Sequence, residues 1–97
     1  MVVFLGIEIP SFEEADEEEN PIVHVHFTNG AWDWFVIGAK PLKDGDLYFL
    51  GLVNGIEKEL GFFSLSQIVG VGAIMDEDWE KIGVYDIYED FDLRRFR

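Results

Sequence analysis

The stretch IVHVHFTNGAWDWFVIGA (residues 22–39) decides the fold, because it contains two strand patterns on either side of a turn. In its first half, side chains alternate at the two-residue period of a β-strand, with Val23, Val25 and Phe27 on one face and His24, His26 and Thr28 on the other. Asn29-Gly30 follows, a pair typical of a type I′ hairpin turn, which needs positive φ at both central positions. The residues from Ala31 to Ala39 therefore predict the returning strand, with Trp32, Trp34 and Val36 on one face.

The residues before this hairpin predict one more strand and an acidic loop. Val2 to Ile9 is apolar and rich in β-branched residues, and Pro10 ends it because proline has no N–H for a sheet ladder. Ser11 to Asn20 contains six acidic residues and two apolar ones. We expect a solvated loop here, or alternatively an acidic arm that faces a partner.

Two further strands and a helix are predicted after the hairpin. The strands are Leu47 to Val53 and Glu57 to Phe63, preceded by turns at Lys40 to Asp46 and at Asn54-Gly55. Gly61 is expected to weaken the second of them or to form a bulge in it. Ser64 and Gln67 have the spacing of a capping box, so we expect a short helix over Leu65 to Val69 that ends at Gly70 and Gly72.

The C-terminal quarter predicts a helical turn at Asp76 to Trp79 and a strand from Gly83 to Tyr88. The tail from Phe91 to Arg97 mixes aromatic and basic residues, and we expect Arg94, Arg95 and Arg97 to pair with acidic groups of the same chain. Together these elements predict an α+β, β-rich fold: an antiparallel meander of about five or six strands with one or two short helices. Residues 1–97 are expected to form a single small acidic domain.

Composition narrows the class of protein. The chain is 48% hydrophobic and 15% aromatic, which is too much for a disordered acidic chain. It contains no cysteine, and so it has no disulfide framework, no thiolate metal site and no cysteine nucleophile. The apolar start from Met1 to Ile9 is short and lacks a basic region, so we do not expect a signal peptide. A cytoplasmic protein is the expectation.

The strongest feature of the composition is negative charge. Twenty Asp and Glu residues against seven Lys and Arg give a formal net charge of -13. The excess lies in one run from Glu13 to Glu19 and in a second group between Asp76 and Asp92. This charge repels nucleic acid and anionic membranes, and it attracts basic surfaces such as the grooves in which other proteins hold DNA or RNA.

Three segments resemble a known family. They are Trp32-Asp33-Trp34, Tyr48-Phe49-Leu50-Gly51-Leu52 and Glu59-Leu60-Gly61-Phe62-Phe63-Ser64-Leu65-Ser66-Gln67-Ile68. Over roughly residues 22 to 70 the chain resembles the small bacterial, plasmid and phage proteins grouped as domain of unknown function 2958. That family has no assigned activity, so the resemblance implies a fold and a mobile-element context.

Motifs for chemistry are few. His24 and His26 have a spacing that can chelate zinc, with Asp33 as a candidate third ligand across the turn, although two surface histidines are the simpler interpretation. The segment that starts at Asp76 lacks the glycine and glutamate of a calcium loop. No nucleophile elbow, phosphate loop or dinucleotide motif is present. We therefore expect no enzyme, no catalytic residue and no cofactor. Trp32 and Trp34 are expected in the core, or in an interface if their face is open.

The leading hypothesis is a small acidic interaction protein encoded by a mobile element. It would inhibit a basic nucleic-acid-binding protein by DNA mimicry, as an anti-CRISPR or antirestriction protein does, without binding nucleic acid or membrane itself. The expected partner-binding residues are Glu13, Glu14, Asp16, Glu17, Glu18, Glu19, Asp76, Glu77, Asp78, Glu80, Glu89 and Asp90.

Three alternatives stay open. One is an accessory domain whose charge only keeps it soluble. Another is a metal-binding protein that uses His24 and His26. A homodimer is also considered, formed by pairing of an exposed strand edge such as that of Leu47 to Val53.

Overall fold

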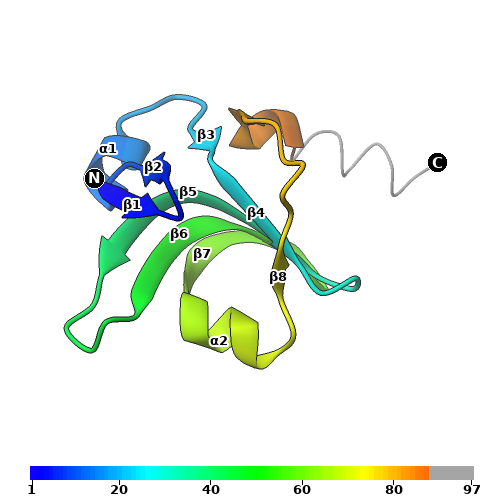
Figure 1. Ribbon diagram of the computed structural model, residues 1–97. Coiled ribbons are helices and arrows are strands. Elements are labelled where there is room, and N and C mark those ends of the chain that lie inside the picture. Colours follow the sequence, from blue (N-terminus) through cyan, green and yellow to red (C-terminus); the bar gives the residue numbers. More distant parts are fainter. Residues whose placement is uncertain (88–97) are drawn as a thin grey trace.

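The computed structural model of the 97-residue chain describes residues 1–87, which form a strongly bent sheet with short elements on both sides (Figure 1). The elements in chain order are β1 (Val2–Phe4), β2 (Ile7–Ile9), α1 (Phe12–Asp16), β3 (Ile22–Val23), β4 (Val25–Thr28), β5 (Asp33–Pro41), β6 (Leu47–Asn54), β7 (Lys58–Ser64), α2 (Leu65–Gly70), β8 (Ile74–Met75) and β9 (Ile82–Gly83). The predicted fold class, α+β and β-rich, is confirmed.

The main sheet contains five antiparallel strands in the order β7-β6-β5-β4-β8. Two small ribbons, β1–β2 and β3–β9, complete the strand pairing of the described residues. The strand Leu47 to Val53, offered as an edge for dimerisation, lies in β6 between β5 and β7. That part of the homodimer hypothesis is therefore wrong, because both sides of β6 already carry ladder hydrogen bonds.

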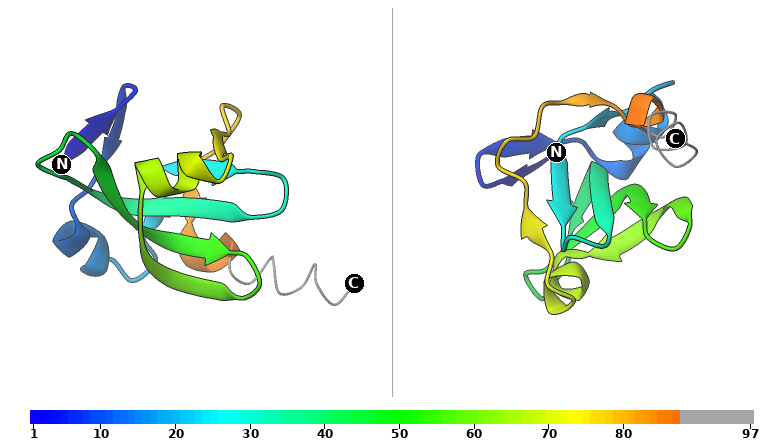
Figure 2. Two further views of the ribbon diagram at one scale, coloured as in Figure 1. Left: turned by 90° about the horizontal axis from the view of Figure 1, so that it is seen from below. Right: turned by 90° about the vertical axis from the view of Figure 1, so that its right-hand side faces the viewer.

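Each face of the sheet carries its own hydrophobic cluster. The cluster on the first face, here called the α2 face, is Ile9, Val25, Phe27, Trp34, Val36, Ala39, Phe49, Phe63, Ile68 and Ala73. The cluster on the second face, the α1 face, is Ala15, Val23, Phe35, Ile37, Leu52, Val84 and Ile87. Figure 2 shows α2 and the β1–β2 ribbon on one side of the sheet, with α1 on the other. Strand β5 supplies both clusters, so all six residues from Trp34 to Ala39 are buried.

The bulge expected at Gly61 is absent from β7, where Gly61 pairs in regular register with Gly51. The irregularity lies instead in β5, where the register with β6 shifts between Val36 and Gly38. The extra residue puts both Ile37 and Gly38 on the α1 face. A side chain at Gly38 would press on Phe12 and Ala15, so the bulge leaves room for α1 to pack closely.

The N-terminal third differs from the sequence prediction in two places. The single strand expected over Val2 to Ile9 is a hairpin, because Leu5 and Gly6 take positive φ values of 49° and 81° and fold the segment back on itself. The acidic loop expected over Ser11 to Asn20 contains helix α1. Ser11 accepts a hydrogen bond from the Glu14 backbone N–H, and the Glu14 carboxylate accepts one from the Ser11 N–H. This capping box outweighs the mutual repulsion of the acidic residues.

The deciding hairpin is less regular than predicted. The strand Ile22 to Thr28 is interrupted at His24, so Val23 packs on the α1 face while Val25 and Phe27 pack on the α2 face. The turn is wider than a type I′ turn, because Thr28 pairs with Asp33 and four residues lie between them. Asn29 shapes this loop through its side-chain oxygen, which accepts from the N–H groups of Ala31 and Trp32 at 3.0 and 2.8 Å.

The C-terminal part confirms one prediction and corrects two. The Ser64–Gln67 capping box is present at the start of α2, and Gly72 with a φ of 85° follows its end. Asp76 to Trp79 is a turn rather than a helix, held by the Asp76 side chain, which accepts from the Asp78 N–H. The strand expected over Gly83 to Tyr88 is also wrong, since β9 ends at Gly83 and residues 84–87 are helical. Tyr88 and the arginine cluster at 94, 95 and 97 lie outside the described residues.

Within residues 1–87, every helix is too short to reach across a lipid bilayer.

The capping box of α1 gives a first prediction. Replacing Ser11 with alanine removes the acceptor for the Glu14 N–H, and we expect it to lower the free energy of unfolding by about 1 kcal/mol. Urea denaturation followed by circular dichroism measures the loss. Glu13→Gln is the matched control, because Glu13 is exposed on the same helix and takes no part in the cap. Equal stability of Ser11→Ala and the control would contradict the capping role.

Candidate functional site

The first acidic stretch forms an exposed surface at one end of the molecule. All six of its acidic side chains, Glu13, Glu14, Asp16, Glu17, Glu18 and Glu19, are exposed. Glu14 has a structural task as well, and its hydrogen bonds with Ser11 hold the pKa of its carboxyl below the usual value. The amino terminus lies 4.0 Å from the same carboxylate.

The second acidic stretch divides into structural and free carboxylates. Glu77, Asp78 and Glu80 are exposed, while Asp76 is partly buried and hydrogen-bonded. Glu89 and Asp90, also expected to bind a partner, lie outside the described residues. Within residues 1–87, the ion pairs of the two stretches come from the amino terminus on Glu14 and from His26 on Asp76.

The short β3–β9 ribbon joins an early and a late part of the chain, with one acidic stretch leading into each of its ends. Ile22 pairs with Gly83 and Val23 with Ile82, so the residues that precede β3 lie beside those that follow β9. Asn20 fixes this junction: its side chain donates to the Asp86 carboxylate at 3.1 Å and accepts from the Tyr85 N–H at 3.0 Å. The end of the first acidic stretch is therefore tied directly to Asp86, while Glu77, Asp78 and Glu80 approach the ribbon from its other end.

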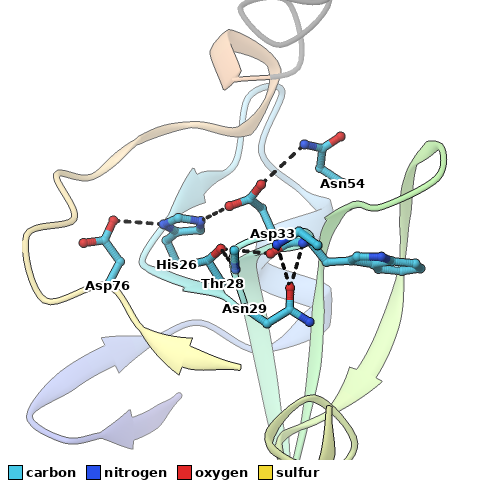
Figure 3. Close-up of polar contacts among 9 residues, drawn as sticks. His26, Thr28, Asn29, Asp33, Asn54 and Asp76 are labelled. Atoms are coloured by element: carbon cyan, nitrogen blue, oxygen red, sulfur yellow. Dashed lines mark hydrogen bonds and ion pairs between the residues drawn. The ribbon is translucent and has the colours of Figure 1, made fainter. Parts of the chain in front are cut away.

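A second polar group ties the acidic turn to the sheet (Figure 3). The His26 ring lies between two carboxylates, with Nδ1 2.9 Å from Asp76 and Nε2 2.7 Å from Asp33. The three residues come from β4, from the start of β5 and from the residue after β8. The Asp76 backbone N–H also donates to the His26 carbonyl at 2.8 Å, and the Asn54 side chain reaches Asp33 at 3.5 Å.

This His26–Asp33–Asp76 triad is an electrostatic clasp. Ionised carboxylates only accept hydrogen bonds, so both contacts are satisfied together when the imidazole carries a proton on each nitrogen. The ring is stacked on Phe35 at 4.6 Å, with an interplanar angle of 8°, and Trp79 lies 5.1 Å away. The hydrogen bond from His26 is the main reason that the pKa of Asp76 lies below its usual value. The clasp links β4 to the start of β5 and to the residue after β8.

The two histidines do not form a metal site with Asp33. His26 uses both ring nitrogens on carboxylates, and His24 is bonded to neither of them. In the described part of the chain, no group of three His, Cys, Asp or Glu side chains is placed to hold a metal ion. His24 instead lines a hollow of about 390 Å³ with Glu8, Glu14 and Glu18. Burial, and then the charge of Lys81, hold the pKa of His24 below its usual value.

Of the two tryptophans Trp32 and Trp34, one is buried and the other is partly exposed. Trp34 is buried at 5% exposure, as the core interpretation predicts, whereas Trp32 is 38% exposed. Their rings are stacked with centroids 6.1 Å apart. The four-residue loop after β4 takes Trp32 out of the strand, which the two-residue turn expected from Asn29-Gly30 would not have done.

Comparisons with family models, with curated proteins and with solved structures find no match to this chain. The resemblance to domain of unknown function 2958 therefore stays a prediction.

The sequence did not reveal the clasp, because Asp76 lies fifty residues from His26 in the chain and no local spacing links them. It did bring His26 and Asp33 to the same hairpin, although as possible metal ligands. The junction at Asn20 was missed for the same reason, since it joins residues 66 positions apart.

The clasp gives a second prediction. Asp76→Asn removes one ionised acceptor from a partly buried histidine, and we expect it to lower the free energy of unfolding at pH 6 by about 1–2 kcal/mol. Folding lowers the pKa of Asp76 below its usual value of 3.8, so the folded state favours the carboxylate form. The stabilisation is complete above that usual value and disappears as the pH falls through the lower pKa of the folded state.

Urea unfolding of both proteins between about pH 2 and pH 6 measures this difference. The gap between wild type and Asp76→Asn should be constant at the upper end and close at the acid end. Glu77→Gln, which removes the same charge from an exposed neighbour, should change stability little at any pH. A gap that persists unchanged to the acid end would contradict the electrostatic role of Asp76.

Proposed function

We propose that this protein is a small acidic interaction protein that occupies a basic nucleic-acid-binding surface on a partner protein and so excludes DNA or RNA from it. Its concrete form is an inhibitor of the anti-CRISPR or antirestriction type, acting by mimicry of phosphate charge. It performs no chemistry on the partner. Exposed carboxylates take the positions that phosphates would otherwise hold.

One observation carries this proposal: the carboxylates of Glu13 to Glu19 and of Glu77, Asp78 and Glu80 are exposed. Glu17, Glu18 and Glu19 lead directly into Asn20, which holds Asp86 from the other end of the chain. Glu77, Asp78 and Glu80 enter the same β3–β9 ribbon from its far end.

The rigid attachment of these groups adds to the argument. The capping box orients α1, and the clasp anchors the turn that carries Glu77 and Asp78. Carboxylates held on ordered backbone lose less conformational entropy on binding than those of a disordered acidic tail. Fields of this kind also speed encounter with a basic partner, by an amount that decreases as salt increases.

The resemblance to a family of plasmid and phage proteins supports the mobile-element context of this proposal. Mobile elements meet host nucleases that hold DNA in basic grooves. A compact acidic domain of 97 residues has a size suited to block such a groove.

The third prediction tests this function directly. DNA cleavage by purified CRISPR effector complexes and by restriction endonucleases is measured with and without the protein. We expect inhibition of at least one enzyme, relieved by excess DNA and weakened at least about tenfold when salt is raised from about 50 to 200 mM, because mimicry depends on charges that salt screens.

Matched variants separate a specific surface from total charge. Glu17→Gln removes one charge from the first acidic stretch, and Asp44→Asn removes one exposed charge from the turn between β5 and β6. Only Glu17→Gln should weaken inhibition. Inhibition that is insensitive to salt, or that leaves DNA bound, would overturn mimicry. Absence of inhibition in both enzyme classes would favour the accessory-domain alternative.

A further inference from the structure

A groove beside the β6–β7 turn combines an exposed aromatic ring with two carboxylates. It encloses about 330 Å³ and is lined by Trp32, Val53, Ile56, Glu57 and Glu59. These residues belong to neither acidic stretch considered so far. We propose that this groove binds an arginine side chain of the basic partner, an inference that rests on the proposed function and names the chemistry its partner presents.

The position of Trp32 is fixed from two sides. One neighbour is Trp34, whose ring is stacked on it at an interplanar angle of 27°. The other is the backbone of Gly55, where any added Cβ would clash with the Trp32 ring. Gly55 is therefore required for the indole to lie against the β6–β7 turn. The Trp32 N–H and carbonyl are held by the Asn29 side chain and backbone, so the ring is presented on an ordered loop.

The sheet register places a carboxylate at the end of the same row of side chains. Trp34 pairs with Val53 and Val53 pairs with Glu59, so these three side chains follow one another across the α2 face. Glu57 stands in the turn itself, where its carbonyl accepts from the Gly55 N–H at 3.1 Å. Both glutamates are exposed. Their lysine neighbour, Lys58, alternates to the opposite face of β7 and does not line the groove.

Arginine is the side chain that this combination fits. Its planar guanidinium stacks on tryptophan and donates paired hydrogen bonds to a carboxylate, whereas lysine offers a compact and strongly hydrated charge. Its aliphatic stem would cover Val53 and Ile56, of which Ile56 is 85% exposed. An apolar peptide would leave both glutamates desolvated without a partner, which is unfavourable. The chemistry of the groove therefore favours a basic occupant over an apolar one.

The groove would give the proposed inhibitor a specificity that charge alone lacks. Long-range electrostatic attraction acts on any basic surface. The Trp32 ring, held between Trp34 and Gly55, would add binding energy only for a side chain that reaches it in the right geometry. Basic nucleic-acid-binding grooves are rich in arginine, because one guanidinium can donate two parallel hydrogen bonds to a phosphate.

The fourth prediction uses a blocked tetra-arginine peptide as the probe and heteronuclear NMR of the full chain as the readout. We expect the Trp32 indole N–H and the backbone amides of residues 53–59 to shift most. Glu57→Gln/Glu59→Gln should weaken this binding by about fivefold or more, and Glu8→Gln/Asp44→Asn by less than about twofold. A tetra-lysine peptide should bind at least about threefold more weakly than tetra-arginine.

Trp32→Phe and Trp32→Leu complete the test. Phenylalanine keeps an aromatic face and should retain part of the affinity, whereas leucine should lose the preference for arginine over lysine. Glu57→Gln/Glu59→Gln changes only exposed side chains, so its binding still tests the groove if a tryptophan variant fails to fold. Equal losses in both charge-matched pairs, or shifts confined to 13–19 and 76–80, would overturn the groove while leaving mimicry intact. Arginine-specific binding at Trp32 without any salt-dependent inhibition of a nuclease would instead keep the groove and overturn mimicry.

Discussion

The rest of the structure depends on the burial of β5 from both sides. Trp34 and Val36 face one cluster and Phe35 and Ile37 face the other, so both surfaces of the sheet must be covered. Burying a large apolar side chain contributes roughly 1.5–3 kcal/mol, and β5 contributes several of them to each cluster. Because the chain has only 97 residues, the elements that cover the two faces of the sheet are short. The β1–β2 ribbon and α2 cover one face, and α1 and the helical residues 84–87 cover the other.

Short elements bury little apolar surface. Each short element that covers a face is therefore also held in place by polar contacts. Ser11 and Glu14 close the first turn of α1, while Ser64 and Gln67 do the same for α2. The segment between β8 and β9 has almost no regular structure, so it is held by Asp76 on His26 and by the Trp79 indole, which donates to the Val23 carbonyl at 2.9 Å. Some carboxylates of this acidic chain are thus parts of the fold.

The features predicted correctly from the sequence are those that depend on residues close together in the chain. The strands of β6 and β7, the α2 capping box and the glycine after α2 all follow from patterns within a few residues. The α1 capping box was equally local, but the six acidic residues around it indicated a loop more strongly. The interruption at His24 was not visible, because it arises where β3 leaves the main sheet to pair with β9. Residues 84–87 look strand-like alone, yet tertiary packing of Val84 and Ile87 on the α1 face makes them helical.

The acidic residues fall into two groups, those that bond to other groups of the domain and those that are exposed. Asp33 and Asp76 bind His26, Asp46 accepts from Ser66, and Glu14 caps α1, so these groups are occupied within the domain. The carboxylates of Glu17, Glu18, Glu77, Asp78, Glu57 and Glu59 are exposed. Fixed, like-charged groups repel each other and reduce the stability of the free domain. In the proposed complex a basic partner would remove that repulsion, so the arrangement that weakens the isolated fold would strengthen binding.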